Sequence, residues 1–174
     1  MLRLAAAAAE EVTREIGSSD IAYVQVEAVL AQCDLFLNEG KALQEKTQKA
    51  QKSWAQKEQN LQSEAAQLQE KYQKGLITTN DAQAQQQSIE KRVAAYQSSA
   101  QKEAQALDEE NYVFTNRAQD LLHRAVQDIN ADKKYKMIVN STALIDADTT
   151  LNITPAVLAK VNELYAADQK AEKK

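Results

Sequence analysis

Between Lys41 and Asn130 the chain contains one glycine, Gly75, and no proline. Most of this stretch consists of Ala, Gln, Glu, Lys and Leu, which are strong helix formers. Because glycine and proline are the residues that most readily end a helix, a stretch this long with one such break is expected to be helical on both sides of it. The sequence therefore predicts two long helices, over about 41–74 and 81–130.

Apolar and small residues recur along both predicted helices at steps of three and four. The mean step, about 3.65 residues, keeps them on one narrow face of a nearly straight helix. One such face buries little surface alone, but two antiparallel helices can bury each other. We therefore predict a coiled-coil-like hairpin arm over residues 41–131, with a second helix about 75 Å long. The recurring residues are Leu43, Thr47, Ala50, Trp54, Leu61, Ala65, Leu68, Tyr72 and Leu76, and then Ile89, Val93, Tyr96, Ala100, Ala104, Leu107, Phe114, Ala118, Leu122, Ala125 and Ile129.

The break between the helices has the residues of a helix end followed by a helix start. Gly75 can take the left-handed conformation that terminates the first helix. Thr78 and Asp81 have the spacing of a capping box at the start of the second.

Strand-forming segments lie at the two ends of the chain. Ile21–Val26 and Tyr135–Asn140 are rich in β-branched and aromatic residues, and Ala143–Asp146 is a shorter third candidate. A short helix is predicted over Glu27–Leu37, and Thr154-Pro155 starts another one. We expect the ends to meet in one small β-sheet.

These elements divide the chain into four parts. Residues 1–20 form an N-terminal extension that begins with a helix, and residues 166–174 a flexible, Lys-rich tail. Residues 21–40 and 132–165 form a small β-sheet body that is too small to be stable alone, so it is expected to oligomerise. The residues predicted to form the interface are Ala22, Val24, Val26, Met137 and Val139.

Charge excludes some classes of partner. The net charge is −4, and residues 41–131 carry 12 basic and 12 acidic residues, so the chain lacks the basic surface of a nucleic-acid-binding protein. A contact of Lys133-Lys134-Tyr135-Lys136 with a membrane surface is an alternative without further support, because such a run more often caps a helix. No apolar stretch is long enough to span a membrane, and Met1-Leu2-Arg3-Leu4 with five alanines is too short for a full signal peptide.

The sequence predicts neither an enzyme nor a cofactor site. It has no nucleotide-binding loop and no set of ligands with metal spacing. His123 is the only histidine and is read as a helix-surface residue. Cys33, the only cysteine, cannot form an internal disulfide and is read as structural.

Three segments in this order resemble the Skp/OmpH family of periplasmic chaperones. Ile21-Ala22-Tyr23-Val24-Gln25-Val26 resembles the family's first strand, and Tyr135 to Asn140 its second. Asn152-Ile153-Thr154-Pro155-Ala156-Val157-Leu158-Ala159-Lys160-Val161-Asn162 resembles its closing helix start. With the hairpin between them, the resemblance covers residues 20–165.

The resemblance implies a periplasmic trimer whose arms enclose a cavity for unfolded outer-membrane proteins, held without ATP. The better-known members are strongly basic, whereas this chain is acidic, so no lipopolysaccharide site is transferred. Tyr72, Leu76 and Ile77 lie at the predicted tip of the arm and either fix the turn or contact the client. The alternative function is a coiled-coil scaffold without chaperone activity.

Overall fold

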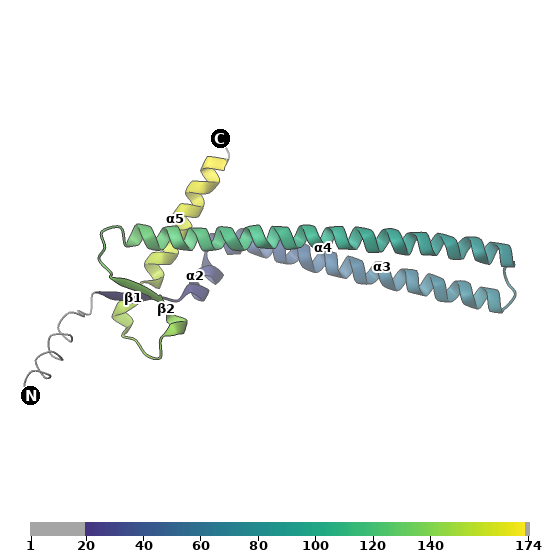
Figure 1. The fold of residues 1–174 in the computed structure, drawn as a ribbon, viewed down its shortest axis with the longest axis horizontal. Coiled ribbons are helices and arrows are strands. Elements are labelled where there is room, and N and C mark those ends of the chain that lie inside the picture. Colours follow the sequence, from purple (N-terminus) through teal and green to yellow (C-terminus); the bar gives the residue numbers. More distant parts are fainter. Residues whose placement is uncertain (1–19, 173–174) are drawn as a thin grey trace, which may run out of the picture. The chain divides into compact units, whose positions relative to one another are not determined.

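The structure, a computed structural model, describes residues 20–172, so the helix predicted over residues 1–16 lies outside the described part. The elements in chain order are β1 (Ile21–Val24), α2 (Val26–Gln32), a π-helix (Phe36–Gly40), α3 (Lys41–Gln73), α4 (Thr79–Ile129), β2 (Met137–Asn140), 3₁₀ turns at Ser141–Ala143 and Thr149–Leu151, and α5 (Thr154–Glu172) (Figure 1). The predicted fold class, mainly helical with a long hairpin and a small sheet, is confirmed.

The described chain divides into two compact units. We call Lys41–Phe114 the arm, and residues 20–40 with 115–172 the body. The predicted arm extended to residue 131, whereas the last part of α4 belongs to the body. The reason is that Leu121 and Ala125, near the end of α4, are buried there.

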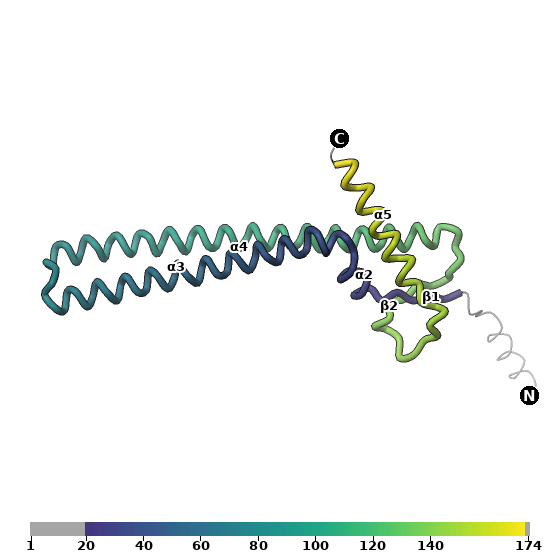
Figure 2. The backbone as a smooth tube through the Cα atoms, turned by 180° about the vertical axis from the view of Figure 1, so that it is seen from behind, coloured from purple at the N-terminus to yellow at the C-terminus, as the bar shows by residue number. Residues whose placement is uncertain are grey.

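The arm consists of α3 and the first part of α4, which lie side by side and antiparallel (Figures 1 and 2). Ala50, Leu68, Ile89 and Leu107, all in the predicted apolar stripes, are its buried side chains. The other stripe residues of the arm are largely half-buried, as expected of two narrow faces in contact.

The turn of the arm has the predicted chemistry. Gly75 has φ of +68°, and the N–H groups of Leu76 and Gly75 donate to the carbonyls of Lys71 and Tyr72 at 2.9 and 3.0 Å. These two bonds are the Schellman pattern that ends a helix. The Asp81 N–H donates to Thr78 Oγ1 at 3.1 Å, so Thr78 caps α4.

The body is built on two parallel strands that the whole arm separates in sequence. β1 pairs with β2 in the register Ile21 to Met137 through Val24 to Asn140. On its other side β1 makes a single bridge, where the N–H of Ile153 donates to the carbonyl of Tyr23 at 3.0 Å. β1 is therefore the central strand, and the predicted meeting of the two chain ends is confirmed.

Side chains from β1, α2, α4 and α5 form the core of the body. Val24, Val29, Leu35, Leu121, Val157 and Val161 are its largest fully buried apolar side chains. Cys33 is also buried there, and its thiol donates to the carbonyl of Leu30 at 3.3 Å. The apolar spacing of the Thr154 helix thus serves to cover the small sheet.

One predicted strand is absent and another is shorter than predicted. The third strand over Ala143–Asp146 is absent, because Ser141–Ala143 forms a 3₁₀ turn in which the carboxamide of Asn140 accepts from the Thr142 N–H. β1 ends at Val24 instead of Val26, because the N–H of Gln25 donates to Thr154 Oγ1 at 2.9 Å and α2 begins. In both cases a side chain takes a backbone group that a strand would need, a nearby one at Asn140 and one distant in sequence at Thr154.

The predicted flexible tail over residues 166–174 is wrong for the residues that the structure describes, because α5 continues to Glu172. Asp168 and Gln169 bind Arg124 and Glu39 with side-chain hydrogen bonds. These polar contacts extend the helix beyond its last apolar contact at Tyr165.

Candidate functional site

Side-chain contacts join α3 to α4 at three levels of the arm. Lys46 pairs with Glu110 at 2.5 Å, and Trp54 Nε1 donates to Glu103 Oε2 at 2.6 Å. Nearest the turn, Arg92 binds both carboxylate oxygens of Glu64, at 2.8 and 2.5 Å. Between this pair and the turn, in residues 65–91, no side-chain hydrogen bond or ion pair crosses from one helix to the other.

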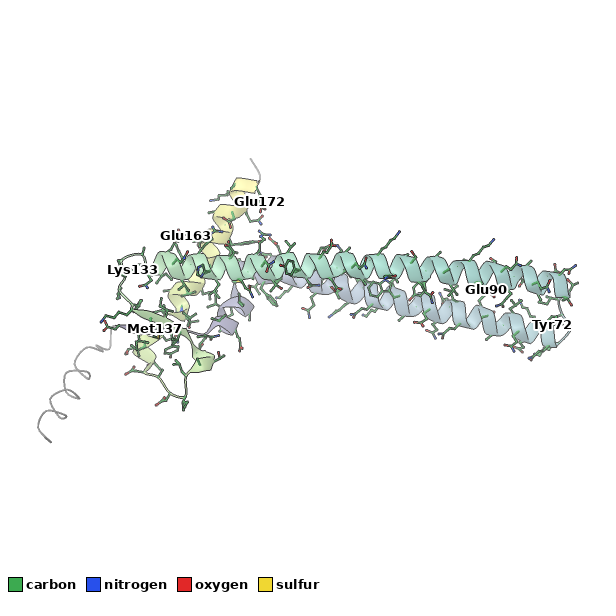
Figure 3. All side chains as sticks on the ribbon, viewed as in Figure 1. Tyr72, Glu90, Lys133, Met137, Glu163 and Glu172 are labelled. Carbon is green, nitrogen blue, oxygen red and sulfur yellow. The ribbon has the colours of Figure 1, made fainter. Side chains whose placement is uncertain are left out.

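The turn exposes apolar side chains. Tyr72 is 49% exposed and Leu76 is 68% exposed, whereas Ile77 is half-buried. Figure 3 shows Tyr72 beside the turn. The structure therefore brings the three predicted client-contact residues together, two of them with a large free surface.

Two further exposed apolar residues were not predicted. Tyr112 is 71% exposed and Val113 59%, both on α4 within the arm. They lie off the apolar stripe, so the recurrence of apolar residues at steps of three and four does not include them. Adjacent large apolar residues at positions outside the stripe were the signal that could have revealed them.

A groove lies between α3 and α4 near the turn, with a volume of about 990 Å³. Its lining contains one charged residue, Glu90, whose carboxylate accepts from Gln86 at 2.9 Å. Figure 3 shows Glu90 on α4 and Tyr72 on α3. The rest of the lining is alanine, leucine, threonine, tyrosine and glutamine. Ala65, Leu68 and Ala82 are buried or half-buried, whereas the glutamines are exposed, so apolar residues form the floor of the groove and amide groups its rim.

In the body, the half-buried carboxylate of Glu39 joins three elements. Glu39, in the π-helix, accepts from Arg117 of α4 at 2.6 Å and from Tyr165 and Gln169 of α5 at 2.9 and 3.0 Å. Burial, and then the hydrogen bond with Glu39, raises the pKa of the Tyr165 phenol. This network fixes α5 to the other elements of the body and has the features of a structural site, not a reactive one.

A second polar contact of α5 makes the body sensitive to acid. Arg124 donates to both oxygens of Asp168 at 2.9 and 3.0 Å, and these bonds lower the pKa of the Asp168 carboxyl. A carboxyl whose pKa is lowered by folding stabilises the fold above its unfolded pKa, about 3.9. That contribution is lost as the pH falls through the lower, folded pKa.

We therefore expect Asp168→Asn to lower the free energy of unfolding of the body at neutral pH by at most about 1 kcal/mol, because the pair is one-third exposed, and to lower its melting temperature accordingly. The difference from the wild type should be smaller near pH 2, about two units below the unfolded pKa, than at neutral pH. Thermal unfolding followed by circular dichroism at both pH values measures it. Asp146→Asn, in an exposed loop, is the control. A difference equally large at low pH would contradict this role of the ion pair.

The residues predicted to form an oligomer interface differ in exposure. Ala22 and Val24 are buried within the chain itself, Val26 and Val139 are half-buried, and Met137 is 56% exposed. β2 pairs with β1 along one edge, and no other strand of the described chain pairs with its second edge. The unpaired edge of the sheet in the described chain therefore lies at β2, where Figure 3 labels Met137.

No group of three or more His, Cys, Asp or Glu side chains in residues 20–172 is placed to hold a metal ion. His123 lies exposed on α4. In the described part of the chain, none of the helices has both the length and the apolar character needed to cross a membrane.

The comparisons with known proteins agree with this architecture. The model of the family described as outer membrane protein (OmpH-like) matches residues 20–161. A solved structure from Caulobacter crescentus CB15, described as a candidate outer membrane chaperone (OmpH-like), has a TM-score of 0.70 and 16% identity, with 86% of this chain and 87% of that chain covered. No curated protein matches the chain. The family model covers well over half of the sequence, including both strands and the arm between them, and the chain therefore belongs to the OmpH-like outer membrane protein family.

Proposed function

We propose that this chain is an ATP-independent holdase chaperone of the periplasm that binds unfolded outer-membrane polypeptides. Membership of the OmpH-like family and the chaperone description of the Caulobacter structure support a chaperone role. The observation that carries the proposal is the set of exposed apolar side chains on an otherwise polar arm, namely Tyr72, Leu76, Tyr112 and Val113. Exposed apolar residues at several points of one long element suit a partner that has no folded shape.

Weak contacts at separate points are sufficient for such a function. Each exposed apolar side chain contributes little, but contacts on one flexible client add through effective concentration. Release then needs no energy source, because each contact breaks on its own. A client that folds into the outer membrane withdraws its apolar segments from the arm.

We further propose that the chain works as a homo-oligomer, a trimer by analogy with the family. The unpaired edge of β2 and the exposed side chain of Met137 support an interface at the sheet, since free edges readily pair with another strand. Several arms around one client would multiply the weak contacts. Mass measurement in solution, with and without a urea-unfolded outer-membrane protein, tests both the oligomer and client binding.

The tip residues are expected to contribute to holding. Replacing Tyr72, Leu76 and Ile77 together by Ser removes most of the apolar surface at the turn. The affinity for an unfolded barrel protein should fall by about tenfold or more, because roughly 1 kcal/mol is lost for each exposed apolar contact. Helix content should stay unchanged, since Gly75 and Thr78 form the turn.

The matched control replaces Gln56, Gln97 and Gln101 by Ser, three polar exposed residues of the same helices. Light scattering of a urea-diluted barrel protein at a stoichiometric ratio reads out holding. Equal holding by the tip variant and the wild type would show that these residues serve only the turn.

Salt should affect client binding little. Residues 41–131 carry 12 basic and 12 acidic side chains, and several are already paired across the helices. Long-range attraction of a charged client is therefore weak. The dissociation constant should change by less than about tenfold between about 50 and about 500 mM salt. A steeper loss of affinity would mean that ion pairs, and not apolar contacts, hold the client.

The alternative function is a scaffold whose arm is only a spacer. It predicts normal oligomers and no suppression of aggregation of an unfolded barrel protein at any ratio. The exposed apolar residues of the arm favour the holdase, because a spacer gains nothing from them.

A further inference from the structure

We propose that the groove between α3 and α4 near the turn binds one extended, uncharged polypeptide segment of about five residues, through apolar contacts at its floor and amide hydrogen bonds at its rim. This inference rests on the proposed function, since the segment would belong to the unfolded client. It assigns the groove a specific ligand class, which exposed apolar residues alone do not.

The position of the groove makes it accessible to a ligand. It begins where the cross-helix contacts end, beyond the bidentate pair of Arg92 and Glu64. Along α4 its lining runs from Thr79 to Glu90. That length is about 16 Å on a helix, enough for about five residues of an extended strand. The volume of about 990 Å³ lies at the upper end of the usual range for ligand sites.

The floor of the groove allows a ligand to approach both helices closely. Ala65 and Ala82 present only methyl groups, so a backbone can come near both helices. Leu68 is 6% exposed and closes the floor, and Tyr72, which is 49% exposed, supplies larger apolar surface at one side. A segment with apolar side chains at alternate positions could place them against this floor.

The amides of the rim fit a backbone. Gln69, Gln83 and Gln87 line the groove, and their side chains make no hydrogen bond with any residue of the described chain. Each carboxamide both donates and accepts, as do the N–H and C=O groups of a peptide unit. An extended segment has these groups free, because it forms no helix or sheet of its own.

The spacing of two glutamines matches the repeat of a strand. Gln83 and Gln87 are four residues apart on one face of α4, which is about 6 Å along the helix axis. The backbone groups on one edge of a strand recur every two residues, about 6.7 Å apart. One extended segment lying along α4 can therefore meet both amides in sequence.

Other ligand classes fit this lining less well. Lys and Arg are absent from the lining of the groove, so the lining offers no partner for an anionic headgroup or an acidic segment. A helical ligand keeps its backbone groups internally bonded and would leave the rim amides unpaired. A segment with alternating apolar and uncharged polar residues, the pattern of a transmembrane β-strand, satisfies both the floor and the rim.

The test measures peptide binding to the full chain by fluorescence anisotropy. One labelled peptide is a ten-residue alternation of Thr and Val, and the other is a helix-forming peptide of Ala and Gln. Ala82→Trp fills the groove, and Ala84→Trp, an exposed residue of the same turn that does not line the groove, is the matched control. We expect Ala82→Trp to weaken binding of the Thr-Val peptide at least about tenfold and Ala84→Trp to leave it unchanged.

A second variant tests the rim without filling the groove. Gln83→Leu with Gln87→Leu keeps the apolar floor and the helix propensity, while Gln85→Leu with Gln97→Leu is the control outside the lining. The rim pair should bind the Thr-Val peptide about tenfold more weakly, because two amide contacts are lost. This measurement tests whether the rim amides bind the peptide even if Ala82→Trp disturbs the hairpin.

Three results would overturn the inference. They are unchanged binding of the Thr-Val peptide in the rim pair, equal loss in the control variants, and tighter binding of the helix-forming peptide at the same groove.

Suppression of barrel-protein aggregation by the same variants is measured separately. If the wild type binds the peptide as expected but suppresses no aggregation, the holdase proposal fails and the groove assignment stands. If the wild type suppresses aggregation but the peptide results are negative, the groove assignment fails and the holdase proposal stands.

Discussion

Val24→Asp is expected to unfold the body while the arm stays helical. Val24 is 2% exposed in the central strand of the sheet, and its neighbours in the core are apolar. A carboxylate there has no partner, and the cost is about 4 kcal/mol or more. A sheet of two short strands has little stability in reserve. Hydrogen exchange should therefore become fast across β1, β2 and α5, and the protein should aggregate or fail to form the proposed oligomer.

Met137→Asp is the matched control for this prediction, because Met137 is the exposed residue of the other strand. In one chain its cost should be within about 0.5 kcal/mol, so the body stays folded. If the sheet edge is the oligomer interface, this variant should dissociate into folded monomers. A Val24→Asp protein with wild-type exchange and wild-type mass would contradict the central position of β1.

Leu107→Ala is expected to loosen the arm and leave the body protected. Leu107 is one of the few fully covered side chains of the arm, so its loss should cost about 2–3 kcal/mol. The cost stays at the lower end of the range for buried leucines because the seam is narrow and can collapse. Hydrogen exchange should accelerate along residues 50–114 and remain slow in β1 and α5.

Leu121→Ala is the matched change in the body, on the same helix α4. Its exchange pattern should be the reverse, fast in the body and slow near the turn of the arm. If both variants raised exchange equally in both units, arm and body would unfold as one cooperative unit. The division of the chain at Phe114 would then have no energetic meaning.

The arm could be predicted almost completely from the sequence, and the reason is local. The helices, their facing stripes, Gly75 at the end of α3 and Thr78 at the start of α4 all follow from residues within one or two turns of each other. The meeting of Ile21–Val26 with Tyr135–Asn140 was also predicted, because these are the two longest segments with strand composition.

The errors arose where distant side chains decide the structure. β1 ends early because Thr154, far away in sequence, accepts from the Gln25 N–H. The last turns of α5 are helical because Arg124 and Glu39 bind them, although the Lys-rich composition is typical of a flexible tail. Of the candidate site, the tip was predicted from its position in the turn. The groove was not, because its glutamines look like ordinary solvent-facing residues until α3 and α4 are placed side by side.

The parallel pairing of β1 with β2 has a consequence for the order in which the protein folds. Each paired residue of β1 lies 116 positions before its partner, so the first strand is made long before the second exists. The helices of the arm need only local contacts and can form while synthesis or export continues. Their folding draws the two ends of the arm together, as the pair of Lys46 with Glu110 shows. The hairpin thereby shortens the effective loop between β1 and β2 and lowers the entropic cost of pairing them, so the arm is complete before the sheet.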